Sequence, residues 1–338
     1  MKPHVVHVVP AAPGGGTSSF IEHQIAGLTG AGITSEVEIF SGSALIGQPG
    51  QLPAAVRALR RRINRASPML VHAHWGSLLG AATVLAARRT APIVLTFRGS
   101  DLNPVPSENK LRSAIRLACS QFGARGAAAI ITVSPALAAR IWRPRRPPFV
   151  IPDGTDLATF SPRPRSSARA ALGWQADEPV LLFYAGRSPM VKRLDLATRV
   201  AEIVSMSLPR LRFEVIRGDA PLEQMPLWLS AADCLLMTSD YEGSPNVVRE
   251  ALVCGLPVAS VPVGDVQRWL TDLAGTRIVA RDPTALASAV VGLITAGIRP
   301  QASHLVDQFS LASSISAVIR VYETLSPRLE PAFPERPS

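Results

Sequence analysis

The stretch Ser239–Glu250 constrains this chain more than any other part of its sequence. Four apolar residues, Cys234–Met237, precede it and predict a short buried strand. Small and polar residues then predict a loop that leads into a helix, with Ser244 as the N-cap and Pro245 in the first helical position. Another apolar run, Pro257–Val261, follows the predicted helix. This order of elements is typical of a parallel sheet, which binds ligands at the carboxyl ends of its strands.

The start of this predicted helix suits a ligand that carries both phosphate and hydroxyl groups. The backbone N–H groups of Asn246 and Val247, beside Ser244, lie at the positive end of the helix dipole, where phosphate binds. Glu242 lies in the loop and Glu250 about one and a half turns inside the helix, and carboxylates accept hydrogen bonds from sugar hydroxyls. A nucleotide-sugar fits this order, with ribose at Glu250, diphosphate at the helix start and the donor hexose at Glu242, which we include in the catalytic set.

The run Glu-Gly-Ser-Pro-Asn-Val-Val-Arg-Glu (residues 242–250), followed by Ala-Leu-Val-Cys-Gly-Leu-Pro-Val, resembles the signature of retaining family 4 (group 1) glycosyltransferases of the GT-B fold. The resemblance implies an α/β protein with two facing Rossmann-like domains, parallel sheets and a deep interdomain cleft that holds the active site. It also implies transfer of a sugar from a UDP-, GDP- or similar nucleoside diphosphate-sugar to a hydroxyl acceptor, with retention of anomeric configuration. The expected role is in the synthesis of cell-surface polysaccharide or glycolipid, and no further cofactor is expected.

Two cations are expected on the leaving diphosphate. The segment after the predicted strand Val180–Tyr184 resembles the family's Gly-Arg…Lys-Gly phosphate-binding stretch, with Arg193 in place of the glycine. Arg187 and Lys192 would therefore stabilise the departing diphosphate. Arg217 follows the next predicted strand, in a region that borders the nucleobase in related enzymes. No Asp-x-Asp motif is present in the sequence, so we predict no metal site.

A glycine-rich loop follows the first predicted strand, His4–Val9. By resemblance, Gly15 and Gly16 in this loop would lie near the acceptor and the donor phosphates. The loop also nearly fits the dinucleotide-binding fingerprint Gly-x-Gly-x-x-Gly, and Glu36 lies about 20 residues on, but the third glycine is replaced by Ser19. A nicotinamide-dependent oxidoreductase is therefore an alternative that this loop leaves open.

Polar residues follow the next predicted strands and are candidates for the acceptor side of the site: His74, Arg98 and Asp101. The family usually has His-Gly-x-Asp where this chain has Arg-Gly-Ser-Asp. Arginine stays protonated and cannot act as a general base, but it can hold phosphate or an acidic acceptor group. This arginine leaves open a catalytically silent GT-B subunit, and a nucleotide-sugar epimerase is a further alternative. For His72, and also for His74, a packing or hydrogen-bonding role at the strand end is as reasonable as a role in the site. The turn at Pro152 also departs from the family, because Asp153 replaces an asparagine.

The 338 residues suit two domains of ordinary size. The basic, proline-rich stretch Arg143–Pro148 predicts a linker, with an acceptor-side domain over 1–146 and a nucleotide-sugar domain over 147–310 that begins with a strand at Phe149–Ile151. Residues 311–325 have helical apolar spacing and, by resemblance, would cross back to the first domain, and 326–338 are expected to be disordered. Unpaired cysteine spacing and the lack of a leader or spanning segment predict a cytoplasmic protein.

The chain carries a formal net charge of +10. Val56, Leu59 and Ile63 share one face of a predicted helix. Arginines occupy other positions of that helix: Arg57, Arg60, Arg61, Arg62 and Arg65. Such a helix could rest on anionic lipid at the inner face of the membrane, or its apolar face could pack on the first domain's sheet and leave the arginines in water. A saccharide or lipid-linked saccharide is the expected acceptor, and no nucleic acid partner is expected.

Overall fold

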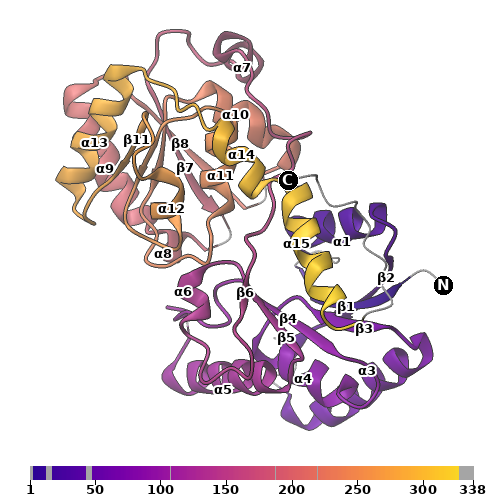
Figure 1. Ribbon diagram of the computed structural model, residues 1–338. Helices are drawn as coiled ribbons and strands as arrows, with labels where there is room; N and C mark the ends of the chain where they lie inside the picture. The colour runs from indigo at the N-terminus through magenta and orange to yellow at the C-terminus, as the bar shows by residue number, and fades with distance from the viewer. Residues whose placement is uncertain are drawn as a thin grey trace. The chain divides into compact units, whose positions relative to one another are not determined.

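The computed structural model describes residues 3–12, 17–42, 48–106, 108–186, 188–218 and 220–326. The chain divides into two compact units (Figure 1). The first unit takes the residues up to Gly154 and those from Leu311 onward, and the second takes Thr155–Ser310. Each unit is built on one parallel sheet with helices packed on it, so the expected pair of Rossmann-like α/β halves is confirmed. No helix in the described ranges combines the length and apolar character that spanning a bilayer requires.

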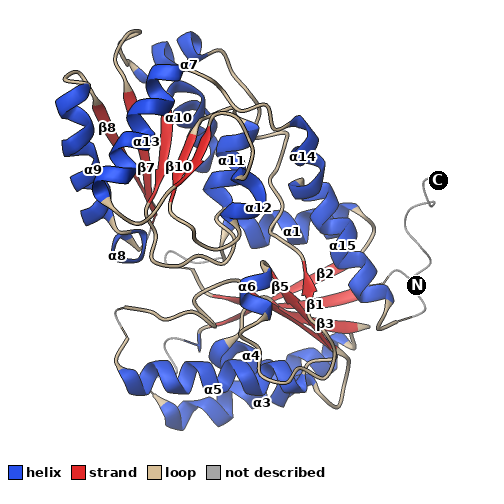
Figure 2. Cartoon of the chain, turned by 60° about the vertical axis from the view of Figure 1, so that its left-hand side comes forward, coloured by secondary structure: helices blue, strands red, loops and turns tan. Residues whose placement is uncertain are grey.

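The first unit has a six-stranded sheet in the order β2-β1-β3-β4-β5-β6. Its strands are β1 (His4–Pro10), β2 (Thr34–Phe40), β3 (Leu70–Ala73), β4 (Ile93–Phe97), β5 (Ala129–Thr132) and β6 (Phe149–Val150). Its helices are α1 (Ser19–Gly30), α3 (Leu52–Ala66) after a 3-10 turn at Pro49–Gln51, α4 (Ser77–Ala87), α5 (Lys110–Gly126), α6 (Pro135–Ala138) and α15 (Leu311–Glu323). Figure 2 shows α1 and α15 on one face of the sheet and α3, α4 and α5 on the other. Parallel pairing brings the carboxyl ends of these strands to one edge.

The last helix, α15, completes the core of the first unit. The spacing of Ile315, Val318, Ile319 and Tyr322 gives it one apolar face, which is buried against the strands and α1. Ile315 passes so close to Gly27 of α1 that any side chain at position 27 would collide with it. The sheet face under α15 is therefore covered only when the end of the chain is in place.

The second unit has a five-stranded parallel sheet in the order β11-β10-β9-β7-β8. Its strands are β7 (Val180–Gly186), β8 (Arg212–Arg217), β9 (Cys234–Met237), β10 (Val258–Ser260) and β11 (Thr276–Ile278). Its helices are α7 (Arg165–Leu172), α8 (Pro189–Lys192), α9 (Leu194–Ser207), α10 (Met225–Ala231) after a 3-10 turn at Leu222–Gln224, α11 (Asn246–Val253), α12 (Val266–Leu270), α13 (Pro283–Ala296) and α14 (Ser303–Phe309). β7 and β9 are neighbours, so the loops that follow them share one end of the sheet.

The boundary between the units lies later than the sequence predicts. β6 pairs with Ile131 and Thr132 of β5, so it closes the first sheet and does not begin the second domain. Arg143–Pro148 is accordingly a loop within the first unit, and the expected boundary after Arg146 is wrong. Phe149 and Val150 are exposed, and two exposed residues carry no pattern that could tell which sheet they join.

The apolar face of α3 packs on the first sheet. Leu59 and Ile63 are fully buried in the same cluster as Val6 and Val71 of the strands, while Val56 is partly buried against it. The interpretation that this helix inserts its aliphatic face into a membrane is therefore wrong, because the sheet already covers that face. The alternative, that the helix packs on the first sheet, is confirmed. Its arginines face outward; Arg62, for example, contacts Glu38 of β2.

Replacement of Ile319 by alanine should lower the free energy of unfolding by about 2–5 kcal/mol, because it leaves a cavity between α15 and the sheet. Arg320→Ala, at an exposed position of the same helix, is the matched control and should change stability by less than about 0.5 kcal/mol. Urea unfolding of both variants measures the difference. Equal stabilities would mean that the end of the chain does not belong to this core.

Candidate functional site

Lys192 and Glu242 meet at the carboxyl ends of β7 and β9. Lys192 ends α8, just after β7, and its Nζ lies 2.5 Å from Oε1 of Glu242 in the loop after β9. Glu242 Oε1 also accepts a hydrogen bond from the Ser239 hydroxyl at 2.7 Å. Both charged side chains are largely but not fully buried. The structure thus brings together two residues that the sequence assigns to neighbouring parts of one ligand, although their direct contact is not predicted.

Backbone contacts hold these two loops against each other. The N–H of Asp240 donates to the carbonyl of Val191 at 2.9 Å, and the Thr238 hydroxyl donates to the carbonyl of Lys192 at 2.7 Å. From a third strand end, Arg281 donates to the Ser239 carbonyl at 2.5 Å. The positions of the ammonium and the carboxylate therefore follow from fixed backbone and not from the long side chains alone.

Arg193 occupies a backbone conformation that favours glycine. Its φ of 57° and ψ of 55° lie in the left-handed region, which agrees with the glycine that the family pattern has at this position. The guanidinium compensates by contacting Asp195 at 2.9 Å and Asp240 at 3.2 Å. Arg193 therefore ties α8 to the loop of Glu242, a role that the sequence departure does not reveal.

The helix α11 starts one residue later than predicted, and Ser244 is not its N-cap. Pro245 takes the cap position with extended backbone and no side-chain cap bond. The Ser244 hydroxyl instead donates to Asp265 Oδ2 at 2.8 Å and accepts from Arg249, which also donates to Asn246 Oδ1 at 2.6 Å. Arg249 and Asp265 were missed by the sequence analysis; the only signal was their charge among buried, apolar neighbours.

Two backbone N–H groups at the start of α11 have no protein acceptor among the described hydrogen bonds: those of Asn246 and Val247. The loop that leads to them packs tightly on Gly264, whose φ is +58°. A Cβ at position 264 would come within 3.0 Å of Glu242 Cβ and 3.3 Å of Pro245 Cδ. The glycine thus allows the loop after β10 to support the loop that carries Glu242.

Glu250 lies on the second turn of α11 and is half-buried. Its carboxylate accepts no hydrogen bond within the described parts of the chain. Burial raises the pKa of Glu250 to about 7, although the positive charge of Arg249 acts in the opposite direction. A half-buried carboxylate with spare acceptor capacity is a suitable partner for hydroxyl donors.

Of the remaining donor-side candidates, Arg217 is the one that lies among the described residues. Arg217 ends β8 with an exposed side chain, and the N–H of the next residue, Gly218, donates to the carbonyl of Gly186 at the end of β7. The predicted phosphate-binding Arg187 lies outside the described residues. The predicted loop glycines, Gly15 and Gly16, lie outside them as well.

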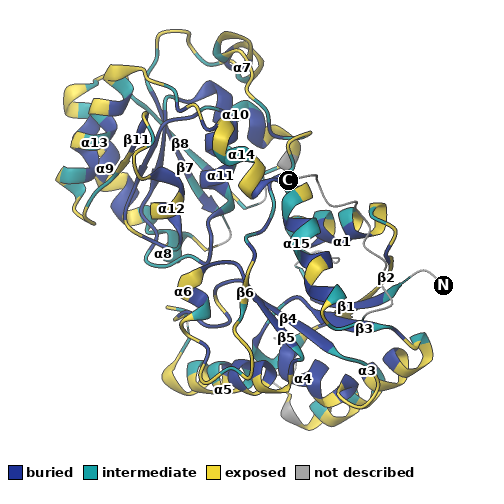
Figure 3. Ribbon diagram, viewed as in Figure 1, coloured by how far each residue is buried: buried dark blue, intermediate teal, exposed yellow. Residues whose placement is uncertain are grey.

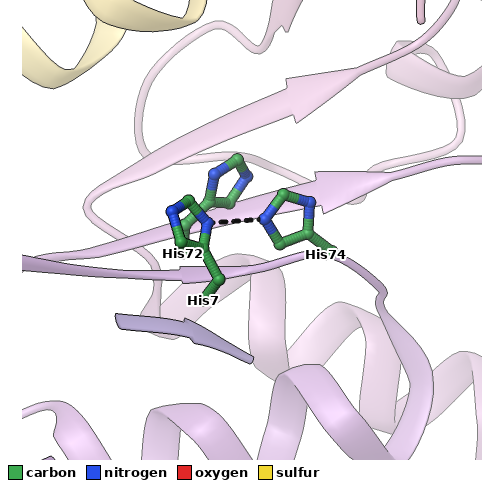
Figure 4. Close-up of side chains that lie close together, drawn as sticks. All are labelled: His7, His72 and His74. Atoms are coloured by element: carbon green, nitrogen blue, oxygen red, sulfur yellow. Dashed lines mark hydrogen bonds between the residues drawn. The ribbon is translucent and has the colours of Figure 1, made fainter. Parts of the chain in front are cut away.

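In the first unit, a directional chain of buried hydrogen bonds runs from Arg98 through His74 to His7. Figure 4 shows the bond between His74 and His7. Arg98 Nη2 lies 3.2 Å from His74 Nδ1, and a guanidinium only donates, so this nitrogen accepts. His74 Nε2 then donates to His7 Nδ1 at 2.9 Å, which leaves a buried N–H on His7 Nε2 that has no hydrogen-bond partner among the described residues. Burial lowers the pKa of His7 to about 3 and lowers the pKa of His74 well below its usual value. Both rings are therefore neutral.

His7, His72 and His74 offer nitrogens within 4.8 Å of one another, the spacing of a possible metal site. Their contacts do not fit a cation, however. Both ring nitrogens of His72 are already bonded, Nδ1 to Tyr322 at 2.6 Å and Nε2 to Thr96 at 2.7 Å. The rings of His72 and His74 are stacked, and the Arg98 cation lies beside His74. The cluster is a hydrogen-bonded link between the sheet and α15.

Arg98 forms a buried ion pair with Asp153. Its Nη2 also donates to Gln24 Oε1 at 2.9 Å, and its guanidinium lies 4.9 Å from the centre of the Phe20 ring. Burial lowers the pKa of Arg98 to about 9, so it is still charged near neutrality. Arg98 and Asp153 are the two departures from the family pattern in this unit. Their contact shows that one departure compensates the charge of the other.

Asp101 organises the loop after β4. Its carboxylate is fully buried and accepts hydrogen bonds from the backbone N–H groups of Gly76, Arg98 and Gly99 at 2.9–3.1 Å. Beside this loop, a cavity of about 230 Å³ lies at the carboxyl ends of the first strands, with Trp75 among its lining residues. The cavity, rather than the buried Asp101 carboxylate, is open to a molecule from solution.

The comparisons with known proteins agree along most of the chain. The family model described as "Glycosyltransferase Family 4" matches residues 2–159, and that described as "Glycosyl transferases group 1" matches residues 177–296. A D-inositol 3-phosphate glycosyltransferase of Geodermatophilus obscurus is 28% identical over 231 residues, which are 56% of this chain and 51% of the relative. A putative teichuronic acid biosynthesis glycosyltransferase, TuaC of Bacillus subtilis, is 29% identical over 241 residues, 66% of this chain and 60% of the relative. The chain thus spans about half of the first relative's length.

The fold agrees with the same family. The crystal structure of Anabaena Alr3699/HepE in complex with UDP and glucose is similar, with a TM-score of 0.73 at 17% identity, over 95% of this chain and 99% of that one. The predicted GT-B fold class is therefore confirmed. The dinucleotide-binding alternative is wrong, because the matched family covers the strand and loop on which it rested.

The compensation of Arg98 by Asp153 can be measured. Asp153→Asn should lower the free energy of unfolding by about 3 kcal/mol, because it removes the charge that balances a buried guanidinium. The double variant Arg98→His with Asp153→Asn, which restores the family pattern at both positions, should recover most of this loss. Asp177→Asn is the control, since it breaks a fully exposed pair with Arg210 and should change the stability far less. A double variant no more stable than Asp153→Asn would contradict the compensation.

The conformation of Arg193 gives a second test. Arg193→Ala should be destabilised by about 1–2 kcal/mol relative to Arg193→Gly, because both lose the same ion pairs and only alanine keeps the left-handed strain. Thermal unfolding of the two variants under one condition gives the comparison. Indistinguishable midpoints would mean that position 193 does not hold this conformation in solution.

Proposed function

The chain belongs to the family 4 (group 1) glycosyltransferases, and from this premise we propose that it moves a sugar from a nucleoside diphosphate-sugar to a hydroxyl acceptor with retention of anomeric configuration. The observation that carries the proposal is the convergence of Lys192, Glu242 and the free N–H groups of Asn246 and Val247 at one end of the second sheet. A cation and two N–H donors suit a diphosphate, and the carboxylate suits hydroxyls of a hexose.

In this proposal, the ligand-free ion pair changes partners when the donor binds. The diphosphate carries more charge than one carboxylate, so Lys192 turns to it, together with the helix start and Arg187. Glu242 keeps its bond from Ser239 and gains acceptor capacity for the hexose hydroxyls. As the bond to the leaving group breaks, negative charge grows on the diphosphate, where these preorganised donors stabilise it. Glu250 accepts from the ribose hydroxyls, and Arg217 lies near the nucleobase.

Two similar proteins support a choice of donor and a biosynthetic role. The similar structure whose name includes UDP and glucose supports a UDP-hexose as the first donor to test. The relative named for teichuronic acid biosynthesis supports a biosynthetic glycosyltransferase. We further propose a saccharide or lipid-linked saccharide acceptor, a role in cell-surface polymer synthesis and action at the cytoplasmic face of the membrane. In the family picture the acceptor proton passes to the departing phosphate, so no strong side-chain base is needed. His72 and His74, at the strand end, are neutral and hydrogen-bonded within the protein, so they need no catalytic role.

A sugar-binding subunit without activity is the second candidate function, and the engagement of Arg98 by Asp153 is the observation that favours it. The pair directs the guanidinium at the position of the usual family histidine to a carboxylate of the protein and not to an acceptor. Hydrolysis or transfer of radiolabelled UDP-hexose by the purified chain decides between the candidates. Turnover supports the transferase, whereas nucleotide binding with no turnover on any acceptor supports the silent subunit.

Calorimetry with UDP tests the assignment of the donor residues. Lys192→Ala should weaken UDP binding by about 10-fold or more, because a buried charge-assisted contact is lost. Glu242→Gln should bind UDP normally and lower transfer by about 100-fold, since its partner is the hexose. If Glu242→Gln instead lost UDP affinity and kept its transfer activity, Glu242 would be assigned to the UDP part of the donor and not to the hexose.

The pH dependence tests Glu250. With its pKa near 7, Glu250 is mostly protonated at pH 6 and ionised at pH 8, and only the ionised form accepts two ribose hydroxyl bonds well. UDP affinity should therefore rise by about 5–10-fold from pH 6 to pH 8. Because the phosphate itself titrates at ~6, Glu250→Gln is the control, and its pH dependence should be smaller by that factor. Parallel pH profiles would remove Glu250 from the ribose site.

A further inference from the structure

Three large apolar side chains lie on the exposed face of α5. Leu111, Ile115 and Phe122 are 69%, 47% and 45% exposed, whereas Arg116 and Ser120 on the opposite side are buried. Figure 3 shows the exposed positions along this helix. At 100° per residue the three apolar side chains fall on one line, here called the α5 stripe. A helix that only packs on its own sheet buries its large apolar side chains, so the exposed stripe needs another explanation.

The orientation of α5 is fixed by its buried polar side chains. Arg116 donates to Glu108 Oε2 at 2.8 Å and to the Ser100 carbonyl at 2.6 Å. Ser120 donates to the Asp101 carbonyl at 2.7 Å. Turning the helix to bury its apolar side would leave these groups without partners, which costs more than the exposed apolar area gains. The stripe is therefore a stable surface of the first unit.

An exposed tryptophan lies in the loop beside α5. Trp142 is 64% exposed, and its backbone N–H donates to Gln121 Oε1 at 2.9 Å, while Gln121 Nε2 donates to the Arg140 carbonyl. These bonds fix the loop of Trp142 beside the end of α5. Apart from the buried Arg116, the charged residues of α5 and of the loop that carries Trp142 are Lys110, Arg112, Arg125, Arg140, Arg143, Arg145 and Arg146, and all are cations. No Asp or Glu occurs in the sequence from residue 109 to residue 152.

We propose that the α5 stripe, with Trp142, is the surface by which this chain docks on a membrane rich in anionic lipid. A bilayer offers what this surface needs, an apolar layer beneath negatively charged headgroups, with tryptophan favoured at the boundary between them. The docking surface is thus the α5 stripe and not the apolar face of α3, which the sheet already covers. An acidic protein would match the cations but would have to bring its own apolar ridge.

The position of the stripe connects docking to the acceptor. Ile115 belongs both to the stripe and to the lining of the 230 Å³ cavity, which also includes Phe40 and Trp75 at the ends of β2 and β3. An apolar path therefore leads from the stripe to the carboxyl edge of the first sheet. This step rests on the proposed function: a docked chain would receive an acceptor whose apolar anchor stays in the bilayer.

Vesicle binding by the full chain tests the proposal. The parent should co-sediment with vesicles of 30% phosphatidylglycerol in phosphatidylcholine and much less with phosphatidylcholine alone. Ile115→Ser with Phe122→Ser should weaken binding to the anionic vesicles by about 10-fold or more, because two inserted side chains are lost. Met206→Ser with Ile298→Ser, at exposed apolar positions of the second unit, is the matched control and should bind like the parent.

A charge pair of variants and a local probe complete the test. Arg125→Glu with Arg145→Glu should weaken binding at low salt, and Arg199→Glu with Arg210→Glu, which changes the net charge equally in the second unit, should do so far less. Emission of Trp142 should shift to the blue on anionic vesicles, a change that Trp142→Phe removes.

Three results would overturn the proposal: no binding by the parent, undiminished binding by the Ile115/Phe122 variant, or a parent dimer that this variant converts to a monomer. UDP affinity, measured in parallel, separates a failure here from a failure of the proposed function.

Discussion

The attraction between Lys192 and Glu242 depends on two loops that are fixed against each other. β7 and β9 are neighbours, so a cation after one strand and a carboxylate after the other necessarily share an edge of the sheet. The backbone hydrogen bond from Asp240 to Val191 then sets the distance between the two loops. The ion pair between Arg193 and Asp240 adds a second contact between them. A site held in this way loses little entropy when a ligand replaces one of the two charges, which is the physical basis of preorganised binding.

The first unit buries a charged side chain and compensates its charge. Arg98 is almost fully enclosed, and a lone guanidinium there would be too costly. Asp153 supplies the opposite charge, Gln24 an acceptor, and His74 a neutral ring whose tautomer follows from its contact with the arginine. The substitution of one family position is therefore accommodated by a substitution 55 residues away, and the polar cluster stays closed.

The sequence predicts the strands and most of the helices because their apolar runs are long and their turns carry glycine and proline. It also predicts that Lys192 and Glu242 lie at one edge of the second sheet, since parallel order alone brings the two strand ends together. It predicts the strand at Phe149–Ile151 but assigns it to the second domain, because two exposed residues carry no pattern that tells which sheet they join. It misassigns Ser244, because the competing partners Arg249 and Asp265 are brought in by tertiary contacts. Both α3 and α5 have apolar residues at helical spacing. The sequence therefore cannot tell that the apolar face of α3 is buried against the sheet while that of α5 is exposed.

The chain order of the units has a consequence for synthesis. The second unit is one continuous segment, whereas α15, which covers the first sheet, leaves the ribosome only after that whole segment. The later unit can therefore complete its core while Val5 and Leu70 of the earlier one still lack part of their cover. A product that stops near Ser310 would expose an apolar sheet face, which chaperones and proteases recognise.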